Sequence, residues 1–321
     1  MSFSGNVKEE LLGHISTARH CQIAELSSIL LFCGRAKWGE EGIRTLKVQT
    51  ENEAVARKCF TLLTKAFNIK AEISTRQNQE KKSVMYTISI DDCRDAARVW
   101  KAAKLSESTV ETGGFSTVSG LVTQNGCCKR AFLRGAFLSA GSMSDPKKSY
   151  HFEIVCSSEE KALLLQKLMC DFEMDAKVVK RKKMFVVYLK EGAQIALMLN
   201  VMEAPVALME LENIRILKEM RNSVNRKVNC ETANINKTVS AAVKQVEDIS
   251  YIDEKMGLDK LSEGLEDIAR TRLKYPEATL KELGELMAEP IGKSGVNHRL
   301  RRLGQIAEKL REANGVQGGT V

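Results

Sequence analysis

The sequence predicts an α+β protein in which one mixed unit of helices and strands occurs twice and an all-helical domain follows. Two apolar runs of helical length, residues 26–34 and 133–141, both end in glycine and lie 107 positions apart. Each run opens the same order of helix, strands, helix, strands and helix. After Arg221 the composition becomes polar and then basic. A chain of 321 residues is long enough for two or three compact units with separate cores.

The two glycine-ended runs are expected to pack against each other. Glycine inside a helix costs about 1 kcal/mol relative to alanine, so Gly135 needs a structural reason. Ser28 occupies the matching position of the first run, and Ala24 and Ala131 precede the pair by four residues, which gives each helix one face of small side chains. We therefore predict that the two helices cross closely about a pseudo-two-fold axis.

Strand and helix patterns divide the repeated part into three segments. Alternating strands are expected at 46–50, 70–73 and 86–90 in the first copy and at 152–156, 176–179 and 185–189 in the second, with helices at 53–67, 91–103, 158–172 and 192–202. The first repeat with an N-terminal helix then covers residues 1–105, and the second repeat covers 128–218. Residues 106–127, rich in glycine, serine and threonine, are interpreted as a connector.

The segment that follows the repeats is interpreted as a polar linker, residues 219–234. Five asparagines occur between positions 222 and 237, where they are expected to cap turns and helix starts. An alternative gives Arg226 and Lys227 a direct role as contacts to a phosphate backbone. Residues 235–313 are predicted to form a helical domain, and residues 314–321 a flexible tail.

The helical domain has the pattern of a helix-turn-helix. A first helix ends at Tyr275-Pro276, because the residue before proline disfavours helix. Thr279 and Glu282 form a capping-box pair that opens the second helix. We expect Leu280, Leu283 and Leu286 to face inward on that helix, Ser294 to cap the third, and Val296, Leu300 and Leu303 to form its buried stripe.

The third helix carries the chemistry expected of a DNA reader. The chain has a net charge of +8, and residues 290–311 contain six basic side chains against Glu308 alone. Asparagine pairs with adenine and arginine with guanine in a major groove that admits a helix. A solvated charged helix is the plain alternative. The predicted DNA-binding residues are Lys293, Ser294, Asn297, His298, Arg301 and Arg302.

A second basic cluster lies on a predicted hairpin of the second repeat. Lys180, Arg181, Lys182 and Lys183 follow one another without an acid, and the equivalent hairpin of the first repeat carries Lys81 and Lys82. They are possible phosphate contacts. The alternative is a solvated hairpin tip that keeps the sheet soluble.

Cysteine usage predicts reduced thiols and no metal or cofactor site. The nine cysteines include no Cys-x-x-Cys pair, and the four histidines are widely separated, so a zinc site would need residues from distant segments. The opening residues show no signal peptide, and no apolar stretch is long enough to span a membrane. These features predict a cytoplasmic protein without a membrane partner.

The paired apolar helices and their strands, over residues 19–203, resemble the LAGLIDADG family of homing endonucleases. The resemblance implies a duplicated αββαββα domain whose strands form a saddle on DNA. In active members of that family the residue before each helix-ending glycine is an acid that holds the catalytic divalent metal. The matching residues here are Cys33 and Ala140. Neither a thiol nor a methyl group supplies the oxygen ligands that Mg²⁺ requires, so no cleavage centre is expected.

Two other functions stay open at this point. An active LAGLIDADG-type site-specific endonuclease with relocated metal ligands would use Glu40, Glu41 or Asp145, which lie beyond the helix ends. The repeat could instead serve as a ligand sensor or a protein-docking scaffold with the helix-turn-helix as its output, although no cofactor motif accompanies that option.

A degenerate LAGLIDADG repeat followed by a helix-turn-helix resembles the WhiA family of Gram-positive bacteria. The most specific stretches are residues 225–234, NRKVNCETAN, and residues 293–301, KSGVNHRLR. The resemblance implies a cytoplasmic, nucleoid-associated regulator of transcription that binds double-stranded promoter DNA and lacks nuclease activity. It also implies roles in cell division, chromosome segregation and, in spore formers, sporulation. RNA polymerase or a WhiB-like iron–sulfur protein is the partner it implies.

Overall fold

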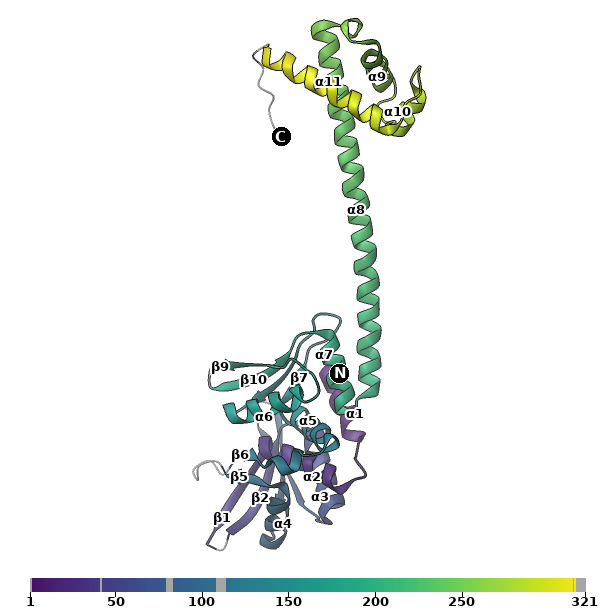
Figure 1. Ribbon diagram of the computed structural model, residues 1–321. Helices are drawn as coiled ribbons and strands as arrows, with labels where there is room; N and C mark the ends of the chain where they lie inside the picture. Colours follow the sequence, from purple (N-terminus) through teal and green to yellow (C-terminus); the bar gives the residue numbers. More distant parts are fainter. Residues whose placement is uncertain (1, 41, 79–82, 108–113, 314, 316–321) are drawn as a thin grey trace. The chain divides into compact units, whose positions relative to one another are not determined.

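The computed structural model describes residues 2–40, 42–78, 83–107, 114–313 and 315. The chain divides into two compact units, Met1–Glu219 and Met220–Val321. Both copies of the repeat lie in the first unit, and the helix-turn-helix lies in the second (Figure 1). The predicted α+β class with a separate helical part is therefore confirmed. Residues 314 and 316–321, which make up nearly all of the predicted tail, lie outside the described residues.

The first unit contains the order αββαββα twice, after an N-terminal helix α1 (Phe3–Gly13). The first copy consists of α2 (Arg19–Cys33), β1 (Gly34–Gly39), β2 (Gly42–Thr50), α3 (Glu53–Phe67), β3 (Glu72–Asn78), β4 (Ser83–Ile90) and α4 (Cys93–Ala103). The second consists of α5 (Gly126–Ala140), β7 (Gly141–Met143), β8 (Phe152–Cys156), α6 (Glu159–Cys170), β9 (Lys177–Arg181), β10 (Met184–Leu189) and α7 (Gly192–Met202). The strands form two antiparallel sheets with the equivalent orders β1-β2-β4-β3 and β7-β8-β10-β9. The predicted duplication is confirmed.

The family resemblance implies a first strand in each sheet, but the residue patterns did not locate it. β1 and β7 begin at Gly34 and Gly141, directly after the last residues of α2 and α5. A strand is normally recognised by the turn residues that bound it, and no turn separates helix from strand here. β7 also has only three residues, which is too short for an alternating pattern.

Helices α2 and α5 cross at the centre of the first unit. A β-carbon added at Gly135 would lie 2.6 Å from the Glu25 carbonyl oxygen and 3.0 Å from the Ser28 β-carbon. Ala24 and Ala131 are fully buried beside this crossing. The predicted close contact is confirmed, and it explains why the glycine is needed.

A buried ion-pair group lies at the same crossing. The Arg134 guanidinium has no exposed side-chain surface, and its Nε donates to the Glu25 carboxylate at 3.1 Å. The Lys58 ammonium lies 3.1 Å from the same carboxylate, and its Nζ donates to the backbone carbonyls of Leu11 and His14. These contacts join α2, α3 and α5 to the end of α1. Glu203, whose carboxylate lies 2.5 Å from the Arg134 guanidinium, supplies the second negative charge for the two buried cations.

The connector is more ordered than predicted. It contains the short strands β5 (Leu105–Glu107) and β6 (Phe115–Val118), which pair with each other, and the 3₁₀ helix η1 (Gly120–Thr123). Residues 108–113 lie outside the described residues. Phe115 and Val118 are buried in the core of the first unit. Burial of these apolar side chains holds β6, and with it the paired β5, against the core.

The predicted polar linker, residues 219–234, is helical. These residues lie inside α8 (Pro205–Met256), so the asparagines cap no turns. Asparagine disfavours a helix interior only weakly, by under about 0.7 kcal/mol per residue. Val224 and Val228 lie in this segment, and their spacing of four residues continues to Ile235 and Val239 of the predicted helical domain, so that all four lie on one helical face.

The second unit packs three helices against the end of α8. They are α9 (Glu263–Lys274), α10 (Leu280–Leu286) and α11 (Lys293–Ala313), preceded by the 3₁₀ helix η2 (Leu258–Lys260). Ile249 and Ile252 of α8 share one core with Leu265, Leu283 and Leu300. The three predicted helices are confirmed, and α11 is the longest of them with 21 residues.

Two details of the helix-turn-helix prediction are wrong. Ser294 is not the N-cap of α11, because the helix begins at Lys293 and the Gly292 carbonyl already accepts from the Val296 amide at 3.1 Å. Leu286 is 47% exposed, since it is the last residue of α10 and the chain turns away there.

Among the described residues, no helix has both the length and the apolar character that crossing a membrane demands.

Candidate functional site

Helices α10 and α11 are held in place by a cap and by a close backbone contact. The Glu282 amide donates to Thr279 Oγ1 at 3.3 Å, and the Thr279 amide donates to the Glu282 carboxylate at 2.7 Å. These hydrogen bonds, from the Thr279 backbone first, lower the pKa of Glu282. A β-carbon at Gly284 would lie 2.2 Å from the Ile291 carbonyl oxygen, so the turn returns directly over α10.

One side of α11 is anchored in the core. Val296, Leu300 and Leu303 are all buried, as the helical spacing predicts. Arg299 also serves the fold, because its guanidinium donates to the Gly264 carbonyl at 3.1 Å. Arg311 lies 2.7 Å from the Asp248 carboxylate. Two of the six basic residues of segment 290–311 are therefore structural, which sequence reasoning did not separate from the rest.

The other side of α11 carries the predicted DNA-binding residues, and every one of them is exposed. We call this set the outer face of α11: Lys293, Ser294, Asn297, His298, Arg301 and Arg302. At about 100° per residue the six span roughly half of the helix circumference. The structure therefore brings all six together on one surface that is long enough to lie in a groove.

Arg302 lies at the margin of this outer face. It lines a shallow pocket together with Lys309 of the same helix, Lys260 at the end of η2 and Ser262 directly before α9. The pocket combines three cationic side chains and a hydroxyl group with apolar side chains such as Leu261 and Ile306. Such a group suits an oxyanion such as a backbone phosphate better than a base edge.

Arg226 and Lys227 do not join the outer face of α11. Both are exposed on α8, and Arg226 Nε donates to the Asn222 carbonyl of its own helix at 3.2 Å. Ile249, where α8 meets the other helices of its unit, lies 23 residues further along, which is about 35 Å of helix. Any phosphate contact that they make is therefore separate from that of α11.

The basic hairpin, residues 180–183, consists of the end of β9 and the turn before β10, and its four side chains are exposed but differ in their contacts. Arg181 pairs across the sheet with Glu153 at 3.3 Å, so its charge is partly neutralised. Lys180 lies over the Phe185 ring at 5.5 Å. β9 is an edge strand, and lysines on an edge strand protect it from pairing with other chains. Lys81 and Lys82 of the equivalent hairpin lie outside the described residues.

The first sheet presents a basic face that sequence reasoning missed. Arg35 and Lys37 alternate with buried residues along β1, and Arg35 lies directly opposite Lys47 of β2. Within the described part of the chain none of the three has an ion-pair partner. Like charges at opposed positions destabilise a sheet unless an anion neutralises them. The alternation of Arg35 and Lys37 with buried residues indicates a basic face only when residues 34–39 are known to form a strand.

The helix ends that hold catalytic metal in LAGLIDADG endonucleases carry different chemistry here. The Cys33 thiol at the end of α2 is mostly buried, which raises its pKa, and the nearby charged groups are Lys8 and Lys161. The Lys161 ammonium donates to the Leu31 carbonyl at 2.9 Å. Two cations at this place disfavour a divalent metal ion.

The relocated acids proposed as an alternative are not assembled. Glu40 is exposed, and the Asp145 carboxylate accepts from the Lys147 amide at 2.9 Å, which caps a turn. Glu41 lies outside the described residues. In the ranges that the structure describes, neither Glu40 nor Asp145 belongs to a group of three or more potential metal ligands.

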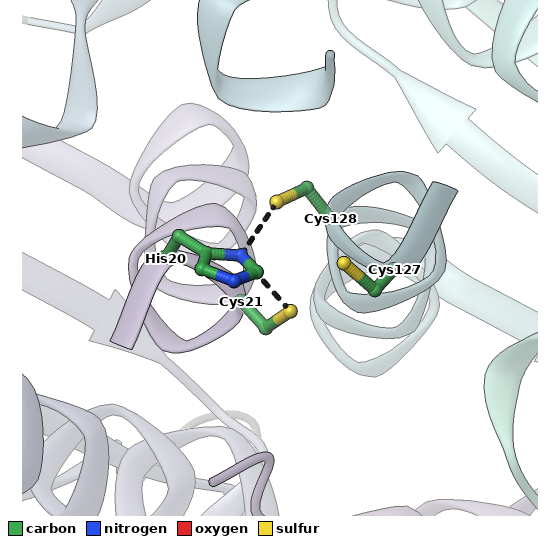
Figure 2. A group of neighbouring side chains, drawn as sticks. All are labelled: His20, Cys21, Cys127 and Cys128. Atoms are coloured by element: carbon green, nitrogen blue, oxygen red, sulfur yellow. Dashed lines mark hydrogen bonds between the residues drawn. The ribbon is translucent and has the colours of Figure 1, made fainter. Parts of the chain in front are cut away.

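One group of potential metal ligands does form, and the sequence analysis did not identify it. His20 and Cys21 on the first turn of α2 meet Cys127 and Cys128 on the first turn of α5, with all four ligand atoms within 4.8 Å of one another (Figure 2). We call this group the thiol–imidazole cluster. The 107-residue offset of the duplication maps His20 onto Cys127 and Cys21 onto Cys128. This equivalence of the two pairs is the sequence signal that could have predicted the cluster.

Comparisons with known proteins agree with this architecture. Three family models match: the WhiA N-terminal LAGLIDADG-like domain over residues 19–105, the WhiA LAGLIDADG-like domain over 129–221 and the WhiA C-terminal HTH domain over 224–307. A relative from Lachnoclostridium phytofermentans, named probable cell division protein WhiA, is 52% identical over 97% of this chain and 100% of its own length. The chain belongs to the WhiA family.

Other members of the WhiA family match over the same extent. One from Alkaliphilus oremlandii, with the same name, is 47% identical over 97% of this chain and 98% of its own. The crystal structure of full-length DUF199/WhiA from Thermatoga maritima is 26% identical, covers 96% of this chain and 99% of its own, and has a TM-score of 0.58. Family membership thus extends over both units.

Proposed function

We propose that this protein is a sequence-specific DNA-binding regulator of transcription that reads promoter DNA with the outer face of α11. The observation that carries the proposal is the division of α11 into a buried apolar side and an exposed side with six polar or basic residues. A helix fixed in this way inserts into a major groove as a rigid element. The matched HTH domain supports the same conclusion.

The residues of the outer face of α11 divide into two roles. Asn297 and Arg301, between the two edges of the face, suit hydrogen bonds to base edges, with Ser294 and His298 beside them. Lys293 at the helix start and Arg302 beside the basic pocket suit phosphate contacts. Base contacts select sequence, whereas phosphate contacts set position and salt dependence.

The repeat domain adds non-specific phosphate contacts in this proposal. Arg35, Lys37 and Lys47 of the first sheet are better placed for them than the basic hairpin, because Arg181 already pairs with Glu153. Lys180, Lys182 and Lys183 stay secondary contacts, as do Arg226 and Lys227 on α8.

The proposed function excludes nuclease activity. Lys8 and Lys161 beside Cys33 support this, since cleavage by a divalent metal needs acidic ligands at that place. Supercoiled plasmid with Mg²⁺ or Mn²⁺ should stay intact. Nicking that disappears in Asp145→Asn or Glu40→Gln would restore the endonuclease alternative.

The biological role follows from the relatives. Proteins named probable cell division protein WhiA support a role in cell division, to which we add chromosome segregation and, in spore formers, sporulation. RNA polymerase or a WhiB-like iron–sulfur protein is the proposed partner, and the nucleoid the proposed location.

The test is DNA binding by the full chain. Fragments recovered with the protein from chromosomal DNA should bind more tightly than random fragments of the same length. Arg301→Ala should cost about 1 to 3 kcal/mol and relax preference at one base position. Lys293→Ala should weaken binding to all sequences and reduce the salt slope by about 1. Arg270→Ala, an exposed arginine of α9, is the matched control and should leave sequence preference unchanged. Equal binding to promoter and random fragments would overturn the proposal.

A further inference from the structure

The thiol–imidazole cluster is built by the pseudo-two-fold symmetry of the fold. Each central helix contributes two adjacent residues from its first turn, and the duplication relates the pairs. Figure 2 shows the Cys127 and Cys128 sulfurs pointing from α5 toward the His20 ring and Cys21 of α2.

The spacing of the four side chains is that of ligands around one small ion. His20 Nδ1 lies 3.2 Å from the Cys128 sulfur and 3.4 Å from the Cys21 sulfur. Tetrahedral zinc with Zn–S of about 2.3 Å and Zn–N of about 2.0 Å places its ligand atoms roughly 3.5 to 3.8 Å apart. The four ligand atoms all lie within 4.8 Å of one another, so the longest distance between two of them exceeds the distance around bound zinc by at most about 1 Å. Small side-chain rotations can close that difference.

The donor set selects the kind of metal. Three sulfurs and one imidazole nitrogen are soft or borderline ligands, which favour zinc over magnesium or calcium. Four protein ligands fill a tetrahedral shell and leave no position for water or substrate. Such closed Cys₃His sites are structural.

A disulfide explains the cluster less well. Any disulfide among Cys21, Cys127 and Cys128 would leave one thiol and the imidazole unused. Cys21 and Cys128 are buried, which limits the access of an oxidant to either thiol.

We propose that His20, Cys21, Cys127 and Cys128 bind one zinc ion that ties together the first turns of α2 and α5. Zinc displaces the protons of the three thiols, which pass to solvent, and Nδ1 of neutral His20 completes the shell. The positive ends of two helices stabilise the resulting thiolates. Cys33 lies 13 residues after His20 along α2, which is about 20 Å, so this site is separate from the place of the lost nuclease metal.

The experiment measures zinc in the full-length protein, prepared with reductant and dialysed against metal-free buffer. Elemental analysis should find one zinc ion per chain in the wild type. A Cys21→Ser, Cys128→Ser double variant should bind zinc more than about 100-fold more weakly, since even outer-shell partners contribute 10- to 100-fold. Cys93→Ser and Cys170→Ser, which change exposed thiols on other helices, should keep full zinc content.

A second measurement does not depend on whether the variants fold. Zinc added to metal-free wild type in weak buffer should release protons up to one equivalent of metal, and cobalt in its place should give the absorption of a tetrahedral thiolate site. A chelator should lower the Tm of the wild type. Wild type that binds no stoichiometric zinc under reducing conditions, or a double variant that retains it, would overturn the proposal.

Discussion

Gly135 of α5 lies so close to Glu25 of α2 that a β-carbon at position 135 would stand 2.6 Å from the Glu25 carbonyl oxygen. The preceding residue of α5, Arg134, binds the carboxylate of the same Glu25. One residue of α2 therefore contacts α5 through both its backbone and its side chain. The close approach permits the ion pair, since a larger residue at 135 would move α5 away from the carboxylate.

We expect Gly135→Ala to destabilise the protein by about 1 to 3 kcal/mol, the usual cost of an overpacked core. Alanine is the better helix former, so a loss of stability would arise from the clash with α2 alone. Gly126→Ala on the same helix is the control, because nothing lies within 4 Å of its added β-carbon. Urea unfolding of both variants measures the difference, and equal stabilities would contradict the close approach.

Glu25→Gln should destabilise the first unit by about 3 to 5 kcal/mol, because it leaves the buried charges of Arg134 and Lys58 without their shared carboxylate. Glu53→Gln is the control. It removes an exposed ion pair with Arg57, so we expect a change of under about 1 kcal/mol. Thermal and urea unfolding test both. A loss at Glu25 no larger than that at Glu53 would show that the buried group is dispensable.

The duplicated fold could be predicted because the repeat was visible in the sequence itself. The strand at 152–156 and the helix at 53–67 have the predicted bounds, since alternation and helical spacing are local signals. The buried partners of Glu25 could not be predicted in this way. Arg134 follows it by 109 positions, and only the crossing of α2 and α5 brings the two together.

The outer face of α11 and the thiol–imidazole cluster differ in the same way, because only the first depends on local spacing. The outer face of α11 follows from the spacing of Val296, Leu300 and Leu303, so its residues could be named from the sequence. The thiol–imidazole cluster could not be found by ligand spacing, because Cys21 and Cys128 become neighbours only after two distant helices pair. Ser294 shows the remaining error, since helix starts vary by one or two residues.

Stability should fall as the solution is acidified, in part through His14. Its Nε2 lies 2.9 Å from the Glu203 carboxylate. Burial first, and the charge of Arg134 second, hold the pKa of His14 below its ordinary value of 6.5. The unfolded chain therefore binds the proton more readily. The stability that neutral His14 contributes to the folded protein is therefore fully present above pH 6.5. It is lost as the pH falls through the lower pKa that His14 has in the folded protein.

The measurement for His14 is urea unfolding between about pH 7.5 and 5.5. The wild type should lose more stability over this interval than His14→Gln, which cannot be protonated. A wild type that gains stability on acidification, or whose slope equals that of His14→Gln, would refute this role.

Gly284→Ala should destabilise the second unit and weaken DNA binding together, because the added β-carbon would stand 2.2 Å from the Ile291 carbonyl oxygen. That oxygen belongs to the turn that leads into α11, so relief of the clash must shift the start of the helix. We expect a loss of about 1 to 3 kcal/mol in unfolding free energy. Gly292→Ala, in the same turn with nothing within 4 Å, is the control for stability. If Gly284→Ala unfolded at the wild-type urea concentration and bound DNA normally, the contact between α10 and the turn would not position α11.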